Sequence, residues 1–276
     1  SGCLHATKAG SKDKMVSEQN KKPAKRADPL MVQSVAKAFR VLEAFDGQHP
    51  QMTLSDIAEQ TGLDLSGAQR FAHTLESLGY LEKDTRTRQF QLSVKTLDLA
   101  HHFTRTSRLV DRAMPVLQYL SKETEETVNL TVLDGTEIVF ISRFLSRHVL
   151  HTDVTIGTRL PAYCMAPGRA MLSRLPPEKV AAILDASDIR AHTRNTVTDV
   201  DRLKEIIEET RMKGYACAFE EVYHADASIA APILGAQGQV IGSVSLAVST
   251  LRYTPEQLEA SFAAMILAAG RSISFS

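Results

Sequence analysis

The sequence is short of the residues from which disulfide frameworks and metal sites are built. It has three cysteines, Cys3, Cys164 and Cys217, and no two of them stand in a C-x-x-C spacing. An odd number of widely separated cysteines excludes a disulfide scaffold and indicates a reduced, cytoplasmic protein. The adjacent His101 and His102 cannot face one ion from a helix. We therefore expect no metal ion and no other cofactor.

The chain also lacks an excess of either charge and any long apolar run. Lys+Arg and Asp+Glu number 32 each, so net charge argues neither for nor against a nucleic-acid partner. No stretch approaches the roughly 20 apolar residues of a membrane span, which predicts no membrane partner. Residues 1–30 are polar and mildly basic, without the apolar centre of a signal peptide. We interpret them as a disordered tail or an expression scar.

Residues 53–92 contain a clear series of signals for helices, a turn and strands. Thr53 followed by Asp56 predicts a capped helix start, and Thr61-Gly62-Leu63 breaks the helical period as a turn requires. A second helix then carries one apolar stripe: Ala68, Phe71, Ala72, Leu75 and Leu78. The Tyr80-Leu81 strand, an Asp84–Arg88 turn and the Phe90/Leu92 alternation follow as a small wing. The whole predicts a winged helix-turn-helix.

Two amphipathic helices around a glycine turn also occur in other small helical domains, and charge does not separate the two readings. Residues 31–95 hold seven basic and eight acidic residues, a net charge of −1. The favourable charges are local, on the second helix and the wing, and local clusters are enough for phosphate contact. The predicted DNA-binding residues are Ser66, Gly67, Gln69, Arg70, His73, Lys83, Arg86 and Arg88.

Helical segments flank this unit on both sides. Ser34–Phe45 predicts a helix with Val35, Ala38, Phe39, Leu42 and Phe45 on its packing face. Residues 93–104 and a second stripe from Leu109 to Leu120 predict a helical connector suited to dimer contacts. We divide the chain into a tail (1–30), a winged helix-turn-helix (31–93), a linker helix (94–112) and an effector-binding domain (113–276).

The second half mixes strands and helices. Val128–Leu133 and Glu137–Arg143 flank Asp134-Gly135, a strong hairpin signal. Further strands are predicted at 149–154, 215–219, 228–234 and 239–248, with 157–161 as loop. Helices are predicted from Pro167 to Leu175, from Pro176-Pro177, after Asp199 and after Thr254. Without strict βαβ order, this pattern indicates an α+β domain with an antiparallel sheet.

Two of these strands have unequal faces. In 239–248, Val240, Val244, Leu246 and Val248 face one way, and Ser243, Ser245 and Ala247 face the other. In the neighbouring strand, Ile229 and Ile233 oppose Asp226, Ser228 and Ala230. A sheet face of small polar residues leaves room for a small ligand, with the 160–168 segment able to close over it. The alternative is a face covered by water or by a helix.

Several stretches in this order resemble the IclR family of bacterial transcription regulators. They are SVAKAFRVLEAF, LSDIAEQTGLDLSGAQRFAHTLESLGYLEKD, the DG hairpin, GTRLPAYCMAPGRAML, RMKGYACAFEE, SIAAPIL and LRYTPEQL, and they cover roughly Val32 to Ile273. The LPAYC form, with VSTLRYTPEQL later, is most similar to the subgroup that governs protocatechuate and p-hydroxybenzoate degradation. The resemblance implies a winged helix-turn-helix, a helical linker and a GAF/profilin-like effector domain. It also implies homodimers, often paired into tetramers, that bind promoter DNA and a small organic acid.

The resemblance also implies an effector site. Family effectors contact backbone amides at positions matching Ala166 and Pro167, but Pro167 has no N–H to donate. Ala218 replaces a side chain that is polar in some relatives, and Gly67 stands where the family usually has Ser or Thr. The expected effector contacts are Arg159, Tyr163, Cys164, Met165, Ala166, Ala218, Asp226, Ser228, Ser245 and Ala247. Tyr163 and Met165 would pack on a ring, which favours an aromatic acid.

Two alternatives remain. The effector could be a short aliphatic keto acid. The protein could instead be an enzyme with Cys164 as nucleophile, a histidine (His148, His151 or His224) as base and Glu220 or Glu221 as acid partner. No Cys–His spacing supports catalysis, and a lone cysteine is usually a small buried hydrophobe. We therefore expect a regulator and not an enzyme.

Overall fold

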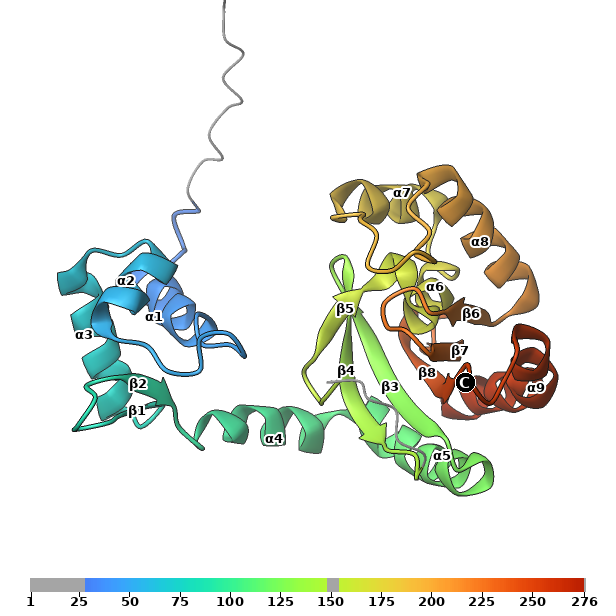
Figure 1. Cartoon of the computed structure of the whole chain (residues 1–276), viewed down its shortest axis with the longest axis horizontal. Coiled ribbons are helices and arrows are strands. Elements are labelled where there is room, and N and C mark those ends of the chain that lie inside the picture. Colours follow the sequence, from blue (N-terminus) through green and yellow to red (C-terminus); the bar gives the residue numbers. More distant parts are fainter. Residues whose placement is uncertain (1–27, 148–153, 276) are drawn as a thin grey trace, which may run out of the picture. The chain divides into compact units, whose positions relative to one another are not determined.

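The computed structural model describes residues 28–147 and 154–275 and divides the chain into two compact units, residues 1–96 and 97–276 (Figure 1). The fold is α+β, as predicted. The strand expected at 149–154 falls almost wholly outside the described residues. Among the helices of the described ranges, none is both long enough and apolar enough for a membrane crossing.

The first unit is a winged helix-turn-helix. It contains α1 (Gln33–Glu43), α2 (Leu54–Thr61), α3 (Leu65–Ser77), β1 (Leu81–Lys83) and β2 (Phe90–Leu92). Thr53 and Asp56 form the predicted capping box of α2, and Gly62 ends that helix with a left-handed φ of 66°. Asp64 then caps α3 by accepting the Gly67 N–H. These local signals fix the angle at which α3 is presented.

Two of the packing faces predicted for this unit are wrong in part. Val35 and Phe39 of α1 are both 52% exposed, because only the C-terminal half of α1, around Val41, packs on the core. Leu78 lies after the end of α3 and is exposed. The remaining α3 stripe is confirmed, with Ala68, Ala72 and Leu75 buried.

The second unit opens with two helices that behave differently. The helix α4 (Thr96–Thr106) has no buried residue, although it carries several large apolar side chains. The helix α5 (Arg108–Thr124) starts at a new cap, Ser107, and buries its apolar stripe against the sheet. The stripe from Leu109 to Leu120 therefore serves its own domain.

A six-stranded antiparallel sheet forms the second unit, in the order β5-β4-β3-β8-β7-β6. Its strands are β3 (Thr127–Asp134), β4 (Glu137–Phe144), β5 (Arg159–Pro161), β6 (Ala216–Phe219), β7 (Asp226–Leu234) and β8 (Val240–Ser249). On one face, α5 and α9 (Pro255–Ile273) cover the main apolar core. On the other lie α6 (Ala166–Leu172), α7 (Pro177–Ala186) and α8 (Val200–Lys213), as Figure 1 shows.

Three sequence predictions for this unit need correction. Residues 159–161 were expected to be loop but form β5, which pairs with β4. The helix expected to reach Leu175 ends at Leu172. Val240 does not share the face of Val244, because a register shift between β7 and β8 reverses the side-chain alternation there, and Ile241 packs on that core instead.

Candidate functional site

The exposed start of α3 and the nearby part of α1 enclose a hollow of about 830 Å³, open to solvent. Ser66, Gly67 and Arg70, three of the predicted DNA contacts, line it. Lys37 of α1 lines it too, which sequence reasoning missed because Lys37 lies 33 residues before Arg70 in the chain. Gln69 and His73 are exposed on the same helix. The hollow thus joins two basic side chains that can contact a phosphate, although Asp64 also lines it and already accepts the Gly67 N–H of the helix start.

The wing turn is built around Asp84. Its carboxylate accepts the backbone N–H of Arg86 (2.7 Å) and of Thr87 (2.8 Å). These hydrogen bonds hold the pKa of Asp84 below its usual value. Arg88 adopts a left-handed backbone with φ 63°, and both arginines are exposed. Lys83 instead lies over the Phe90 ring at 5.1 Å, so it is partly engaged within the wing.

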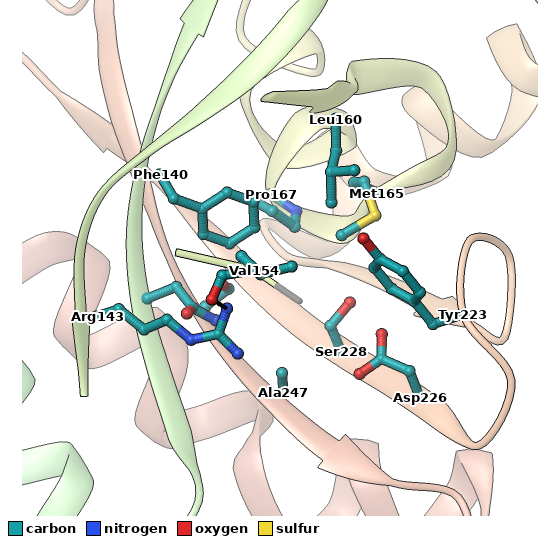
Figure 2. Close-up of a pocket in the computed structure, with 12 residues that line it drawn as sticks. Phe140, Arg143, Val154, Leu160, Met165, Pro167, Tyr223, Asp226, Ser228 and Ala247 are labelled. Carbon is teal, nitrogen blue, oxygen red and sulfur yellow. Dashed lines mark hydrogen bonds between the residues drawn. The ribbon is translucent and has the colours of Figure 1, made fainter. Parts of the chain in front are cut away.

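A second hollow, of about 370 Å³ including its open part, lies on the face of the sheet that carries α6 (Figure 2). Strands β4, β3, β8 and β7 form its floor, and the start of α6 forms part of its wall. The lining residues are Asn129, Phe140, Arg143, Val154, Leu160, Met165, Pro167, Tyr223, Asp226, Ser228, Ser245 and Ala247. The cavity predicted from the unequal strand faces is therefore present.

A β-bulge determines what β4 contributes to this cavity. Phe140 and Arg143 are three residues apart and would face opposite sides of a regular strand. The register of β3 against β4 shifts between Leu130 and Thr131, so that Ile141 and Ser142 both turn toward α5. Phe140 and Arg143 consequently share the cavity face, where sequence reasoning did not place them.

Polar groups lie on two opposite walls of the cavity. On β4, Arg143 donates from Nη1 to the carbonyl oxygen of Val154 at 2.8 Å, and burial lowers its pKa. Its cross-strand partner Asn129 is only 3% exposed, and its Oδ1 has no hydrogen bond from the described residues. On β7, burial raises the pKa of Asp226 to about 7, which the charge of Arg143 partly opposes.

Five predicted effector contacts lie together at this cavity: Met165, Asp226, Ser228, Ser245 and Ala247. Arg159 does not, because it is bound at the surface by Asp134 (2.6 Å) and Glu137 (3.4 Å). The Tyr163 hydroxyl donates to the Arg190 carbonyl at 2.7 Å, away from the lining residues. Ala166 and Ala218 belong to a small cluster of buried alanines beneath α6.

Cys164 is buried and does not line the cavity. Burial raises the pKa of its thiol to about 12, so it is not a thiolate at neutral pH. Glu221, the proposed acid partner, is engaged elsewhere by an arginine, and His148 and His151 lie outside the described residues. Nothing in the geometry of the described residues supports Cys164 as a nucleophile.

A buried ion pair that sequence reasoning missed holds the wall of the cavity. Arg169 of α6 is 2% exposed and binds Glu221 through both oxygens, at 2.5 and 2.7 Å. Its Nε also donates to the Tyr163 carbonyl at 2.8 Å, and Glu221 accepts the Val197 N–H at 3.1 Å. The pair ties α6, which carries Pro167, to the turn that carries Tyr223.

The start of α6 is packed too closely for most residues. A Cβ on Gly168 would lie 2.1 Å from the carbonyl oxygen of Ala162, so the backbone of the preceding turn can approach only a glycine. Pro167 occupies the first turn of the helix, where its missing N–H costs no intrahelical bond. Its ring lines the cavity, and because proline has no backbone N–H, it cannot donate a hydrogen bond to a carboxylate ligand.

Comparison with known proteins agrees with this architecture. A family model described as "Bacterial transcriptional regulator IclR C-terminal" matches residues 101–275, and one described as "IclR helix-turn-helix domain" matches residues 34–85. The Pca regulon regulatory protein of Pseudomonas putida is 32% identical over 257 residues, covering 91% of this chain and 88% of that protein.

Solved structures share the fold over most of the chain. A transcriptional regulator from Rhodococcus sp. RHA1 superimposes with a TM-score of 0.78 at 33% identity, covering 88% of this chain and 97% of that one. An IclR homolog from Microbacterium hydrocarbonoxydans, complexed with 4-hydroxybenzoate, has a TM-score of 0.74 at 24% identity, covering 87% and 97%. At that identity the second likeness is one of fold.

Proposed function

Since the chain belongs to the IclR family of bacterial transcriptional regulators, we propose that the effector controlling its DNA binding is a small aromatic acid held in the cavity around Arg143. The family consists of ligand-responsive DNA-binding proteins and not of enzymes.

The position of Arg143 carries the proposal. It is the one basic side chain among the described residues that line the cavity, and it faces a floor of small residues. A guanidinium stays charged even when buried and offers paired N–H donors that match a carboxylate. Because the site is largely shielded from water, such a charge-assisted contact is stronger there than at the surface. An acid is therefore the ligand class that best matches this wall.

The apolar walls favour a ring over a two- or three-carbon acid. Phe140, Leu160, Met165 and Pro167 face the hollow together (Figure 2). A flat ring buries these surfaces and gains dispersion and aromatic contacts, whereas a short acid leaves them against water. The 4-hydroxybenzoate bound by the homolog from Microbacterium hydrocarbonoxydans is an acid of this kind. The Pca regulon regulatory protein is also a family member similar to this chain.

On the DNA side, we assign base reading to the exposed start of α3. Gln69 and Arg70 would contact base edges in the major groove, while Arg86 and Arg88 of the wing hold phosphates beside it. Lys37 joins the phosphate-binding group because it lines the same hollow as Arg70. One recognition helix buries too little surface for useful affinity, so the operator is expected to contain two half-sites.

Two half-sites require a dimer, and α4 supplies a surface for one. Leu97 is 63% exposed, and Leu99 and Phe103 are each 53% exposed, although α4 is amphipathic. Helices that stay folded in water normally bury such a face. We therefore infer a homodimer paired through α4, which can double to a tetramer. The stripe of α5 is excluded from this role because it is already buried.

The test uses a duplex operator selected from random DNA with the full chain. Aromatic acids such as 4-hydroxybenzoate are expected to change operator affinity and to raise the melting temperature of the protein. Arg143→Ala and Ser228→Phe should abolish both responses and leave basal DNA binding intact, because both changes lie in the effector domain. Arg147→Ala, on a side chain that is 85% exposed close to β4, is the matched control. Undiminished acid binding by both cavity variants would refute the proposed site.

A further inference from the structure

The cavity contains hydrogen-bond acceptors that a carboxylate ligand, which has no proton to donate, cannot satisfy. Arg143 and Asn129 occupy one wall, on β4 and β3, and a carboxyl group, that of Asp226, faces the same hollow from β7. Figure 2 shows Arg143 and Asp226 on opposite sides, with Ser228 and Ala247 between them. A carboxylate ligand bound at Arg143 would therefore point its other end toward a second carboxyl group.

The described residues supply no hydrogen-bond donor to the carboxyl group of Asp226. Among the described residues, no donor forms a hydrogen bond with its carboxyl oxygens, and only the distant charge of Arg143 acts on it favourably. Other aspartates of the chain are satisfied locally: Asp84 accepts two backbone N–H groups, and Asp64 accepts one. A partly buried carboxyl group without donors is costly, and such groups cluster at binding sites.

We propose that Asp226 is a specificity-determining residue that accepts a hydrogen bond from a hydroxyl group on the ligand, at the end remote from the ligand's carboxylate. The effector class is thereby narrowed from small acids to hydroxy acids, in the present case hydroxylated aromatic acids. This inference rests on the proposed function, because it assumes that an acid is anchored by Arg143.

The cavity has a basic group at one end, Arg143, and a carboxyl group at the other, Asp226, which explains why an acid without a hydroxyl group would bind poorly. With benzoate bound, the ring would cover Asp226 and remove its remaining water without replacing it, and above about pH 7, the pKa of Asp226, two negative charges would share one cavity. A hydroxyl group supplies the missing donor and turns that penalty into a charge-assisted hydrogen bond. Sites with buried polar groups discriminate strongly against ligands that leave those groups unpaired.

Asn129, which lies beside Arg143 on the wall opposite Asp226, supports the same proposal. Its amide is buried, and its Oδ1 has no hydrogen bond from the described residues, so a polar atom there also awaits a partner from the ligand. It lies directly across from Arg143 and from Ser245 in the sheet register. The carboxylate that meets Arg143 is held by the guanidinium, whereas the Asn129 Oδ1, which only accepts hydrogen bonds, needs a donor group from the ligand.

A simpler account makes Asp226 only a counter-charge for Arg143. That account predicts that removing the carboxyl group strengthens the binding of every acid alike, because each loses the same repulsion. If Asp226 instead accepts a hydrogen bond from the ligand's hydroxyl group, removing the carboxyl group has opposite effects on the two kinds of acid. Hydroxylated acids lose affinity, while acids without a hydroxyl group keep or gain it. A paired set of ligands separates the two.

The experiment titrates the full chain by calorimetry with 4-hydroxybenzoate, benzoate and 4-methoxybenzoate, whose ether oxygen has no proton to donate. The parent should bind 4-hydroxybenzoate about 10- to 100-fold more tightly than either other acid. In Asp226→Ala this preference should fall to within about threefold. Asp226→Asn, which keeps a neutral acceptor, should show an intermediate preference. The control Asp188→Asn, on a surface carboxyl group that is 84% exposed, should match the parent.

The outcomes are distinguishable. If the parent binds none of the three acids, or binds them equally well in the absence of Arg143, the proposed function fails and this inference fails with it. If the parent binds the acids through Arg143 without preferring the hydroxyl group, or if Asp226→Ala keeps the preference, the inference alone is overturned. Should Asp226→Ala fail to fold, Asp226→Asn decides the question, because it keeps the size of the side chain and should still lose part of the preference for 4-hydroxybenzoate over 4-methoxybenzoate.

Discussion

The buried pair of Arg169 and Glu221 offers a quantitative test of what holds the effector domain together. Glu221→Gln keeps the size of the side chain but leaves the Arg169 guanidinium buried without a counter-charge. Breaking one partner of a fully buried ion pair typically costs about 3–5 kcal/mol. Arg169 is 2% exposed and Glu221 is 7% exposed, so little solvent screening reduces that cost.

In the assay, urea unfolding is followed by circular dichroism and tyrosine fluorescence, since the chain has no tryptophan. With a slope of about 2 kcal/mol per molar urea for a domain of this size, the midpoint should fall by about 1.5–2.5 M. The exposed pair of Arg202 and Glu205 provides the control, because Glu205→Gln should change stability by no more than about 0.5 kcal/mol.

A double replacement, Arg169→Met with Glu221→Leu, tests the cause of the loss. It removes both charges, so it should recover a large part of the stability lost in Glu221→Gln. Recovery will be incomplete because the Tyr163 carbonyl and the Val197 N–H also lose their partners. A loss below about 1 kcal/mol in the single variant would show that the pair is open to water and would refute the reasoning.

Three further predictions concern other parts of the chain. Arg70→Ala should weaken operator binding by about 1–3 kcal/mol and relax sequence preference, whereas Arg88→Ala should weaken all duplexes alike and reduce the salt slope, as binding measured across salt concentrations will show. Phe103→Glu should convert the dimer to monomer in sedimentation at micromolar concentration; an unchanged dimer would exclude α4 as the interface. Asp226 has a pKa of about 7 in the folded protein against an ordinary 3.8, so losing its proton costs more free energy in the folded than in the unfolded state. Its contribution to the free energy of unfolding is therefore full below about pH 4 and is lost as the pH rises to 7. The parent should therefore lose up to about 4 kcal/mol relative to Asp226→Asn over that range in urea titrations, and parallel curves would contradict the raised pKa.

Local patterns predicted much of this fold because the forces behind them are local. The capping box at Thr53, the Asp134-Gly135 hairpin and the helix starts after Asp199 and Thr254 depend on a few neighbouring residues, and all occur as expected. The alternation of β7 and β8 likewise identified Ser228, Ser245, Ala247 and Asp226 as one face. Side-chain alternation is reliable wherever strand pairing is regular.

The predictions failed where pairing is irregular or contacts are distant in sequence. Bulges in β4 and near the start of β8 shifted Arg143, Phe140 and Val240 to faces that strict alternation does not give. Arg159 looked like a ligand for a carboxylate, but residues 159–161 pair with β4 and bring it to Asp134 and Glu137. No sequence pattern joins Arg169 to Glu221, which lie 52 residues apart.

The same alternation that builds the cavity also connects it to the opposite face of the sheet. Asn129 faces the cavity, while its neighbours Val128 and Leu130 are buried in the core that α5 covers. Ligand that draws Asn129 and Arg143 together would tighten β3 against β4, and the side chains packed on α5 would have to follow because close-packed cores do not deform freely. Such a movement changes DNA affinity only to the extent that the ligand binds one arrangement of the protein more tightly than the other. We therefore expect Leu130→Ala, which loosens this contact without touching the cavity, to weaken the effect of ligand on operator affinity more than it weakens ligand binding itself.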